Sequence, residues 1–227
     1  SIVAGGFTGS VHVVHRTAET VQGVPAVRRL ADLSFVPDLV VVAAPAQRVI
    51  DVLREAAAVG CPGAVVLSSG FAELGAGGVR LQQELLELAR DSSMRVVGPN
   101  CLGLLNTHPA IRLDATFSGF VPPAGGLALA SQSGGVGIVL ADLARQLGVG
   151  VGMLVSLGNK VDVSGNDLLA AWRDDPHVTA AGLYLESFGN APKFARIARE
   201  FSERKPLLAV VGGRTPGGRR AGTSHTA

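Results

Sequence analysis

The sequence predicts an α/β fold with two doubly wound parallel sheets. Short apolar runs rich in Val, Leu and Ala recur along the 227 residues. Continuous apolar runs of this length are typical of strands that are buried on both faces. Segments with one apolar and one charged face stand between the runs, as expected of helices that cover a sheet. Strands that alternate with helices imply parallel sheets with helices on both sides.

The N-terminal stretch differs from the usual start of such a domain. The segment SIVAGGF, residues 1–7, is predicted to be the last turn of a helix that stops at Gly5 and Gly6. The run VHVV, residues 11–14, is then predicted to be a strand. The first strand of a doubly wound domain normally lies centrally in its sheet. We therefore expect that strand to lie upstream of Ser1, and the chain to be a fragment at both ends.

The remaining elements follow in order. The predicted strands lie within Asp38–Ala46, Gly63–Phe71, Met94–Gly103, Gly126–Gly135, Gly152–Lys160, Gly182–Asn190 and Leu207–Arg214. The segments between them are predicted helices, and the helical pattern is clear in residues 46–60, 134–148 and 190–205. In the first of these, one face carries Val49, Leu53, Ala56 and Ala57.

A stretch without a clear period separates the two predicted sheets. It covers Asn106–Gly126 and holds three prolines, which is typical of a linker. We therefore expect a first domain over residues 1–120 and a second over residues 121–227.

Composition excludes several classes of protein. Hydrophobic residues make up 47% and aromatic residues only 4%, so the core is expected to consist of Val, Leu, Ala and Ile. The net charge is +2 and the basic residues are scattered, which argues against nucleic-acid binding. Every apolar run is interrupted before about 18 residues, so no membrane helix is expected. A signal peptide at Ser1 is not expected either. Cys61 and Cys101 form neither a CxxC pair nor a metal-ligand spacing. These features predict a reduced cytoplasmic protein without a metal site.

Candidate sites lie where the predicted strands end, because ligands of open parallel sheets bind beyond the carboxyl ends of the strands. In SQSGGVG, the backbone N–H groups of Ser133, Gly134 and Gly135 open a helix and suit a phosphate or carboxylate. The alternative is a tight turn with Ser133 as the helix N-cap.

An acid and a histidine are further candidates. Glu186 ends an apolar strand, where an unpaired carboxylate is costly. One possibility is that Glu186 points into a cleft toward a cationic or N–H partner. The alternative is that it is a partly exposed acid at the end of the strand. His225 follows Arg219 and Arg220 in a loop of Gly, Thr and Ser. It is either an exposed residue without a role or an imidazole that travels between sites.

Four other strand ends carry weaker signals. Pro99, Asn100 and Cys101 form either a ligand site or a turn with a buried thiol. The segments AAPA and SSGF offer similar clefts of small residues. Asn159 and Lys160 either contact a substrate or form a surface turn.

A nicotinamide-binding reading is disfavoured. The glycine spacing closest to the dinucleotide fingerprint, Gly148, Gly150 and Gly152, leaves a predicted helix and enters a strand, which is the reverse of what the fingerprint requires. The VHVV strand is followed by His15 and Arg16 in place of an acidic residue.

Five motifs, in order along the chain, resemble those of the NDP-forming acyl-CoA synthetases. They are GPNCLGLLNT, SQSGGVG, SLGNKVDVSGNDLL, YLESFGN and GTSHTA. This family is related to the alpha subunit of succinyl-CoA synthetase, and the likeness covers almost the whole chain. The segments YLESFGNAPKFARIAR and SHTA resemble the sequences of actinobacterial members that are fused to a GNAT acetyltransferase domain. The resemblance implies a Rossmann-like CoA-binding domain followed by a flavodoxin-like ligase domain.

The resemblance also implies a role for each strand end. His225 matches a phosphohistidine on a swinging loop, and Glu186 matches the acid that holds its imidazole. Asn159 and Lys160 would lie near the substrate. The implied phosphoryl site consists of Ser131, Ser133, Gly134 and Gly135, and the implied pantetheine site of Pro45, Ser68, Gly70, Asn100 and Cys101.

The implied reaction converts acyl-CoA and phosphate to acyl phosphate and CoA, phosphorylates His225 and passes the phosphoryl group to ADP. ADP or ATP with Mg would bind to an ATP-grasp partner domain or subunit, and a homo-oligomer is expected. The segment VHVVHRT departs from the family's VYPVNPK, so that a lysine expected near the CoA phosphates is absent and Arg16 stands nearby. This departure favours an alternative, a non-catalytic module that senses acyl-CoA or nucleotide and regulates an attached acetyltransferase.

Overall fold

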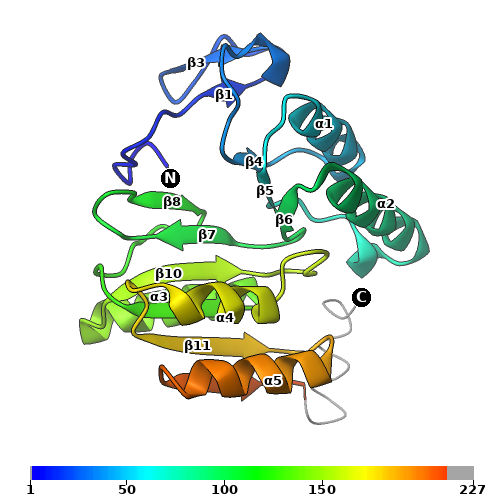
Figure 1. The fold of residues 1–227 in the computed structure, drawn as a ribbon. Helices are drawn as coiled ribbons and strands as arrows, with labels where there is room; N and C mark the ends of the chain where they lie inside the picture. Colours follow the sequence, from blue (N-terminus) through cyan, green and yellow to red (C-terminus); the bar gives the residue numbers. More distant parts are fainter. Residues whose placement is uncertain (1, 214–227) are drawn as a thin grey trace.

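The computed structural model describes residues 2–213 of the chain, and they form two α/β units, one above the other in Figure 1. The first unit is centred on a sheet of three parallel strands in the order β4-β5-β6. Helices α1 and α2 pack on it, and α1 buries the predicted stripe that includes Val49, Leu53 and Ala56. The bounds are β4 Val40–Val42, α1 Ala46–Ala58, β5 Gly63–Val66, α2 Ala76–Ser92 and β6 Arg95–Val97.

The N-terminal segment agrees with the prediction in part. Residues 2–6 form a turn that stops at Gly6, which has a φ of +73°. The N–H groups of Gly6 and Phe7 donate to the carbonyls of Val3 and Ile2 at 3.3 and 3.4 Å, which is the hydrogen-bond pattern of a glycine-capped helix end. The VHVV strand is present only as β1 (Val13–Val14), and it pairs with β3 (Val24–Val27), which also pairs with β2 (Thr20–Val21). These strands form a small sheet of their own beside the one that contains β4. Such two-residue pairings are too short to show in a hydrophobic pattern.

The second unit is built on a six-stranded sheet in the order β12-β11-β9-β10-β7-β8. Four of these strands are parallel. Helix α3 packs on one face of the sheet, and α4 and α5 pack on the other (Figure 1). The bounds are β9 Leu127–Ser131, α3 Gly134–Leu147, β10 Val151–Ser156, α4 Gly165–Asp174, β11 Ala180–Leu185, α5 Ala191–Ser202 and β12 Leu207–Val211.

The predicted linker is part of this sheet. Residues 106–126 contain β8 (Leu113–Thr116), which pairs antiparallel with β7 (Gly103–Asn106), and β7 pairs antiparallel with β10. The linker prediction is therefore wrong for β8, and the sheet is parallel in its main part only. The predicted division at residue 120 separates β7 from β10, to which it is hydrogen-bonded. A four-residue strand among prolines carries too little periodicity to be recognised.

Backbone hydrogen bonds join the two units. The segment of residues 159–163, which follows β10, lies alongside β6 and the turn after it. The N–H groups of Asn159, Val161 and Val163 donate to the carbonyls of Pro99, Gly98 and Val96 at 2.9, 3.0 and 3.1 Å. The edge of the first sheet is thus covered by a loop of the second unit.

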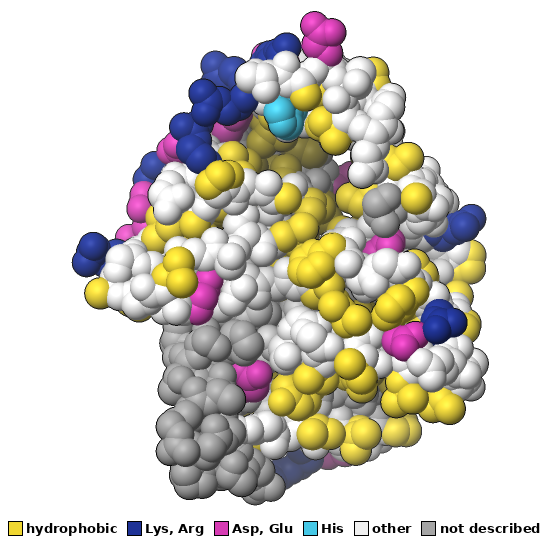
Figure 2. Space-filling model, turned by 180° about the vertical axis from the view of Figure 1, so that it is seen from behind, with side chains coloured by type: hydrophobic (Ala, Val, Ile, Leu, Met, Phe, Trp, Pro, Cys, Tyr) yellow, Lys and Arg dark blue, Asp and Glu magenta, His cyan; other side chains and the backbone are white. Residues whose placement is uncertain are grey.

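The face opposite α4 and α5 exposes apolar side chains. Figure 2 views the molecule from behind and shows hydrophobic side chains gathered over its lower half, where the six-stranded sheet lies. Leu147 of α3 and Leu208 of β12 are 68% and 69% exposed, respectively.

Among residues 2–213, none of the helices combines the length and apolar character that crossing a bilayer requires.

Candidate functional site

The candidate residues of the second unit lie at one edge of its sheet. Strands β9, β10 and β11 are parallel neighbours, so their carboxyl ends meet at this edge. β9 leads into α3, β10 leads into the loop that holds Asn159 and Lys160, and β11 leads into the loop that begins at Glu186. The fold thus brings together residues that are far apart in the sequence.

The start of α3 combines a cap with free donors. The Oγ of Ser133 accepts a hydrogen bond from the N–H of Val136 at 3.3 Å, so Ser133 is the N-cap. Among the described residues, the N–H groups of Gly134 and Gly135 have no hydrogen-bond partner. Ser131 is fully buried, and its hydroxyl donates to the carbonyl of Ser133 at 2.7 Å. Ser131 therefore shapes the turn, while the two glycines present free N–H groups at the positive end of the helix dipole.

The buried side chain of Gln132 orients the loop after β11. Its Oε1 accepts hydrogen bonds from the backbone N–H groups of Glu186 and Ser187, the latter at 2.9 Å. Its Nε2 donates to the carbonyl of Ser187 at 2.9 Å. The loop that carries Glu186 is therefore tied to the turn that opens α3, and Glu186 itself is half-buried.

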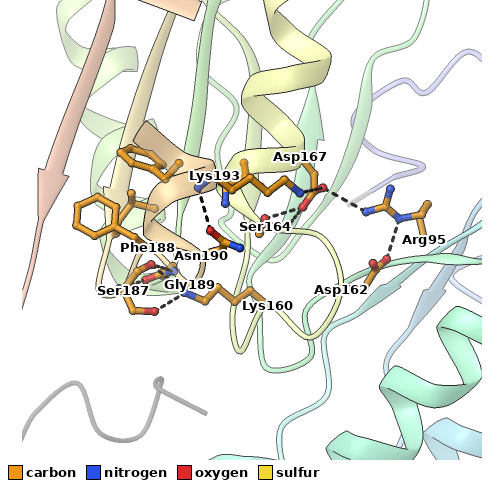
Figure 3. Close-up of a pocket in the computed structure, with 15 residues that line it drawn as sticks. Arg95, Lys160, Asp162, Ser164, Asp167, Ser187, Phe188, Gly189, Asn190 and Lys193 are labelled. Atoms are coloured by element: carbon orange, nitrogen blue, oxygen red, sulfur yellow. Dashed lines mark hydrogen bonds and ion pairs between the residues drawn. The ribbon is translucent and has the colours of Figure 1, made fainter. Parts of the chain in front are cut away.

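Lys160 reaches the same loop from β10. Its Nζ donates to the carbonyl of Ser187 at 2.9 Å and also to the Ser187 hydroxyl (Figure 3). Burial lowers the pKa of Lys160, and the charge of Glu186 opposes this effect. Lys160 has a positive φ of 47°, which is uncommon for a residue other than glycine. A half-buried cation beside an acid in a cleft is a candidate for binding an anionic substrate.

A pocket of about 410 Å³ lies next to Lys160 and extends to β6 of the first unit. The guanidinium of Arg95 forms an ion pair with Asp162 at 2.9 Å (Figure 3). Lys193 lies 3.5 Å from Asp167 on the other side. The lining residues are Arg95, Gln132, Lys160, Asp162, Ser164, Gly165, Asn166, Asp167, Leu185, Ser187, Phe188, Gly189, Asn190, Lys193 and Phe194.

The candidate CoA residues lie at the carboxyl ends of β4, β5 and β6. Pro45 is exposed and is the N-cap of α1. The hydroxyl of Ser68 donates to the carbonyl of Ala44 and accepts from its N–H at 3.1 Å. Asn100 has a positive φ of 56°, and its N–H donates to the carbonyl of Ser68 at 2.9 Å. These contacts join the three strand ends into one rim.

Gly70 permits a close approach on this rim. Its φ is +109°, and a Cβ at this position would lie 2.7 Å from the Cβ of Ala46. A side chain here would collide with the start of α1, so the backbone alone is presented to a ligand.

Cys101 offers little chemistry of its own. It is 4% exposed, and its thiol donates to the carbonyl of Val66 at 3.3 Å. Burial raises the pKa of the Cys101 thiol to about 12, so the thiolate does not form at neutral pH. Any contact of this residue with a ligand would involve its backbone.

Asn159 is no surface turn. It is 3% exposed, and its Nδ2 donates to Glu73 Oε2 at 2.6 Å and to Gln82 Oε1 at 2.8 Å. Its Oδ1 accepts from the Nδ2 of Asn100 at 3.3 Å. The side chain is thus engaged by three residues of the first unit.

Sequence reasoning missed Glu73, Gln132 and Ser187. Gln132 and Ser187 stand inside motifs that were recognised, and Glu73 lies two positions after the end of SSGF. A polar residue beside a predicted strand end was the available signal.

His225 lies outside the described residues. Among the residues that the structure describes, no group of three or more His, Cys, Asp or Glu side chains could hold a metal ion.

Two family models match the chain. A CoA binding domain matches residues 5–107, and a succinyl-CoA ligase like flavodoxin domain matches residues 124–227. The two matches follow the order expected for the two units.

Curated relatives and solved structures agree with these models. The chain is 36% identical over 220 residues to an ADP-forming acetate–CoA ligase of Methanocaldococcus jannaschii, which covers 97% of this chain and 30% of that protein. It is 34% identical over 218 residues to the alpha subunit of ADP-forming acetate–CoA ligase II of Pyrococcus furiosus, which covers 96% of this chain and 47% of that subunit. The chain thus spans less than half of the length of either relative. The dinucleotide forming acetyl-coenzyme A synthetase 1 of Ca. Korarchaeum cryptofilum, in complex with phosphate and ADP, superposes with a TM-score of 0.89 at 35% identity, over 99% of this chain and 48% of that one.

Proposed function

Since the chain belongs to the alpha-subunit-like family of the NDP-forming acyl-CoA synthetases, we propose that it forms the alpha-like core of an acetate-type acyl-CoA ligase. Its substrates would be acyl-CoA and phosphate, and the phosphoryl group would pass to ADP bound on an ATP-grasp domain or subunit. The relatives are ADP-forming ligases and ligase subunits, which supports this assignment.

The observation that carries the proposal is the meeting of the two candidate sites. A Cβ built on Gly134, at the start of α3, would lie 3.6 Å from the Cβ of Leu102, two residues after Asn100. The N–H of Leu102 donates to the hydroxyl of Ser156 at the end of β10, at 3.0 Å. The proposed phosphate site therefore adjoins the proposed pantetheine site, as transfer between a thioester and phosphate requires.

The proposed chemistry has three steps. A phosphate oxygen attacks the thioester carbonyl, the carbon–sulfur bond breaks, and CoA leaves with the electron pair and takes up a proton. The imidazole of His225 then attacks the phosphorus of the acyl phosphate, and the carboxylate leaves. The phosphoryl group finally moves from the imidazole to ADP.

The residues at the strand ends of the second unit would support these steps by charge. The free N–H groups of Gly134 and Gly135 would hold the phosphate. The ammonium of Lys160 would offset its charge, and Glu186 would accept the N–H of the imidazole and keep the opposite nitrogen available as the nucleophile.

The test is to incubate the protein, together with its ATP-grasp partner domain or subunit, with acyl-CoA and radiolabelled phosphate. We expect acid-labile label on the wild type and none on His225→Ala. His108→Ala is a matched control, because it removes a histidine from the loop between β7 and β8, at the other end of the sheet. Equal labelling of wild type and His225→Ala would refute the role of His225.

A second candidate function is a regulatory module of a protein acetyltransferase, which would bind acyl-CoA or nucleotide without turnover. The altered N-terminal segment favours it, because β1 has only two residues and Arg16 beyond it is exposed. CoA binding without acyl phosphate formation or labelled histidine, in the protein with its partner domain, would support this function and exclude the ligase.

A further inference from the structure

One carboxylate that the proposed steps do not use links the two units. Glu73 lies in a short 3-10 turn, η2 (Ala72–Leu74). Its Oε1 accepts hydrogen bonds from the backbone N–H groups of Gly70 and Phe71 at 2.6 and 3.1 Å. Its Oε2 accepts from the Nδ2 of Asn159 at 2.6 Å. A single side chain therefore holds the loop of Ser68–Phe71 and, across the junction, the residue directly before Lys160.

The partner of Glu73 has no freedom to rearrange. Asn159 is buried, its amide also contacts Gln82 and Asn100, and its N–H donates to the carbonyl of Pro99. The position of Asn159 is thus determined by the first unit, although the residue belongs to the second. Because Lys160 follows it directly, the first unit also determines where the Lys160 backbone lies.

The charge of Glu73 strengthens this link. Burial acts to raise the pKa of Glu73, but the hydrogen bonds from Asn159, Gly70 and Phe71 outweigh it and hold the pKa below its usual range. The carboxylate is therefore ionised at neutral pH, and hydrogen bonds to an ionised acceptor are about twice as strong as neutral ones.

We propose that Glu73 is a positioning residue that aligns the CoA loop of the first unit with Lys160 and the start of α3 in the second. This inference rests on the proposed function, because it takes Gly70 and Asn100 as part of the CoA site. Glu73 does not contact the substrate. It keeps the thioester end of CoA opposite the phosphate, and its loss separates the two.

The test exchanges the carboxylate of Glu73 and the amide of Asn159, first one at a time and then together. Glu73→Gln places an amide NH₂ opposite the NH₂ of Asn159, and Asn159→Asp places two carboxylates opposite each other. We expect each single variant to weaken CoA binding by about ten-fold, the effect of one charged hydrogen bond, and to lower kcat for acyl phosphate formation. The double variant restores a donor opposite an acceptor, so we expect it to recover most of both losses.

The control is Glu84→Gln, which makes the same chemical change at an exposed residue of α2 that is ion-paired with Arg54 at 2.6 Å. CoA affinity is measured by calorimetry and folding by thermal unfolding, and Asn159→Asp alone carries the test if Glu73→Gln does not fold. Unchanged CoA affinity and kcat in a folded single variant would overturn the inference, as would a double variant no better than the weaker single one. A wild type that binds CoA but forms no acyl phosphate refutes the proposed function alone, and the CoA affinities then decide the inference. A wild type that binds no CoA refutes both.

Discussion

At the scale of the residue, burial of Lys160 limits the pH range over which its side chain is charged. Burial lowers the pKa of Lys160, so its ammonium loses its charge at a lower pH than an exposed lysine, whose pKa is about 10.4. If the charge binds phosphate, acyl phosphate formation declines as the pH rises through the lowered pKa. We predict that Lys160→Arg moves this decline to higher pH, because a guanidinium stays charged, and that Lys160→Met weakens phosphate binding throughout.

The matched control for this prediction is Lys193→Arg. Lys193 borders the same pocket but forms an ion pair with Asp167 instead. The rate of acyl phosphate formation is measured against pH for each variant. An alkaline decline at the same pH in the wild type and in Lys160→Arg would show that loss of the Lys160 proton does not cause the decline.

At the scale of the element, the start of α3 has a structural and a proposed binding role that can be separated. Ser133→Ala removes the N-cap and is expected to lower the free energy of unfolding by about 1 kcal/mol. Ser133→Asp keeps a capping oxygen, so stability is retained, but it places a negative charge beside the free N–H groups of Gly134 and Gly135. We predict that Ser133→Asp raises the KM for phosphate at least ten-fold, by charge repulsion of about 1.4 kcal/mol or more.

Urea unfolding and phosphate kinetics on the same two variants check this prediction. An unchanged KM for phosphate in Ser133→Asp would place the anion elsewhere than at this helix end.

At the scale of the whole molecule, the two units depend on a close contact between their backbones. Gly158 has a φ of +53°, and a Cβ there would lie 2.2 Å from the carbonyl oxygen of Pro99. We predict that Gly158→Ala forces the junction apart, lowers the free energy of unfolding by several kcal/mol and exposes the junction to protease, because backbone strain and a collision add together.

Gly148→Ala isolates the strain from the collision. Gly148 has a φ of +66°, and a Cβ there would meet nothing within 4 Å. We expect Gly148→Ala to lower the free energy of unfolding by about 1 kcal/mol, because of the left-handed backbone alone. Equal losses of unfolding free energy in the two variants, measured by urea unfolding, would contradict a tight junction.

The sequence by itself determined the elements whose signal is local. The apolar runs that became β4, β5, β9, β10, β11 and β12 were recognisable, as were the stripe on α1 and the Ser133 cap of α3, because strand burial, helix faces and caps depend on residues a few positions apart. The order of the strand-end motifs also indicated the family.

Only the tertiary structure decided which distant residues meet. The residues of β8 were predicted to form a linker, because they form a strand only through their hydrogen bonds to β7 and show no strand pattern of their own. Asn159 was considered a substrate contact or a surface residue, yet it bonds to Glu73, 86 positions away. Such contacts depend on how the sheets are ordered and joined, and local periodicity carries no information about that order. The physical reason is that a hydrogen bond across the junction is formed only when both units are folded, whereas a helix cap or a buried strand is specified by its own residues.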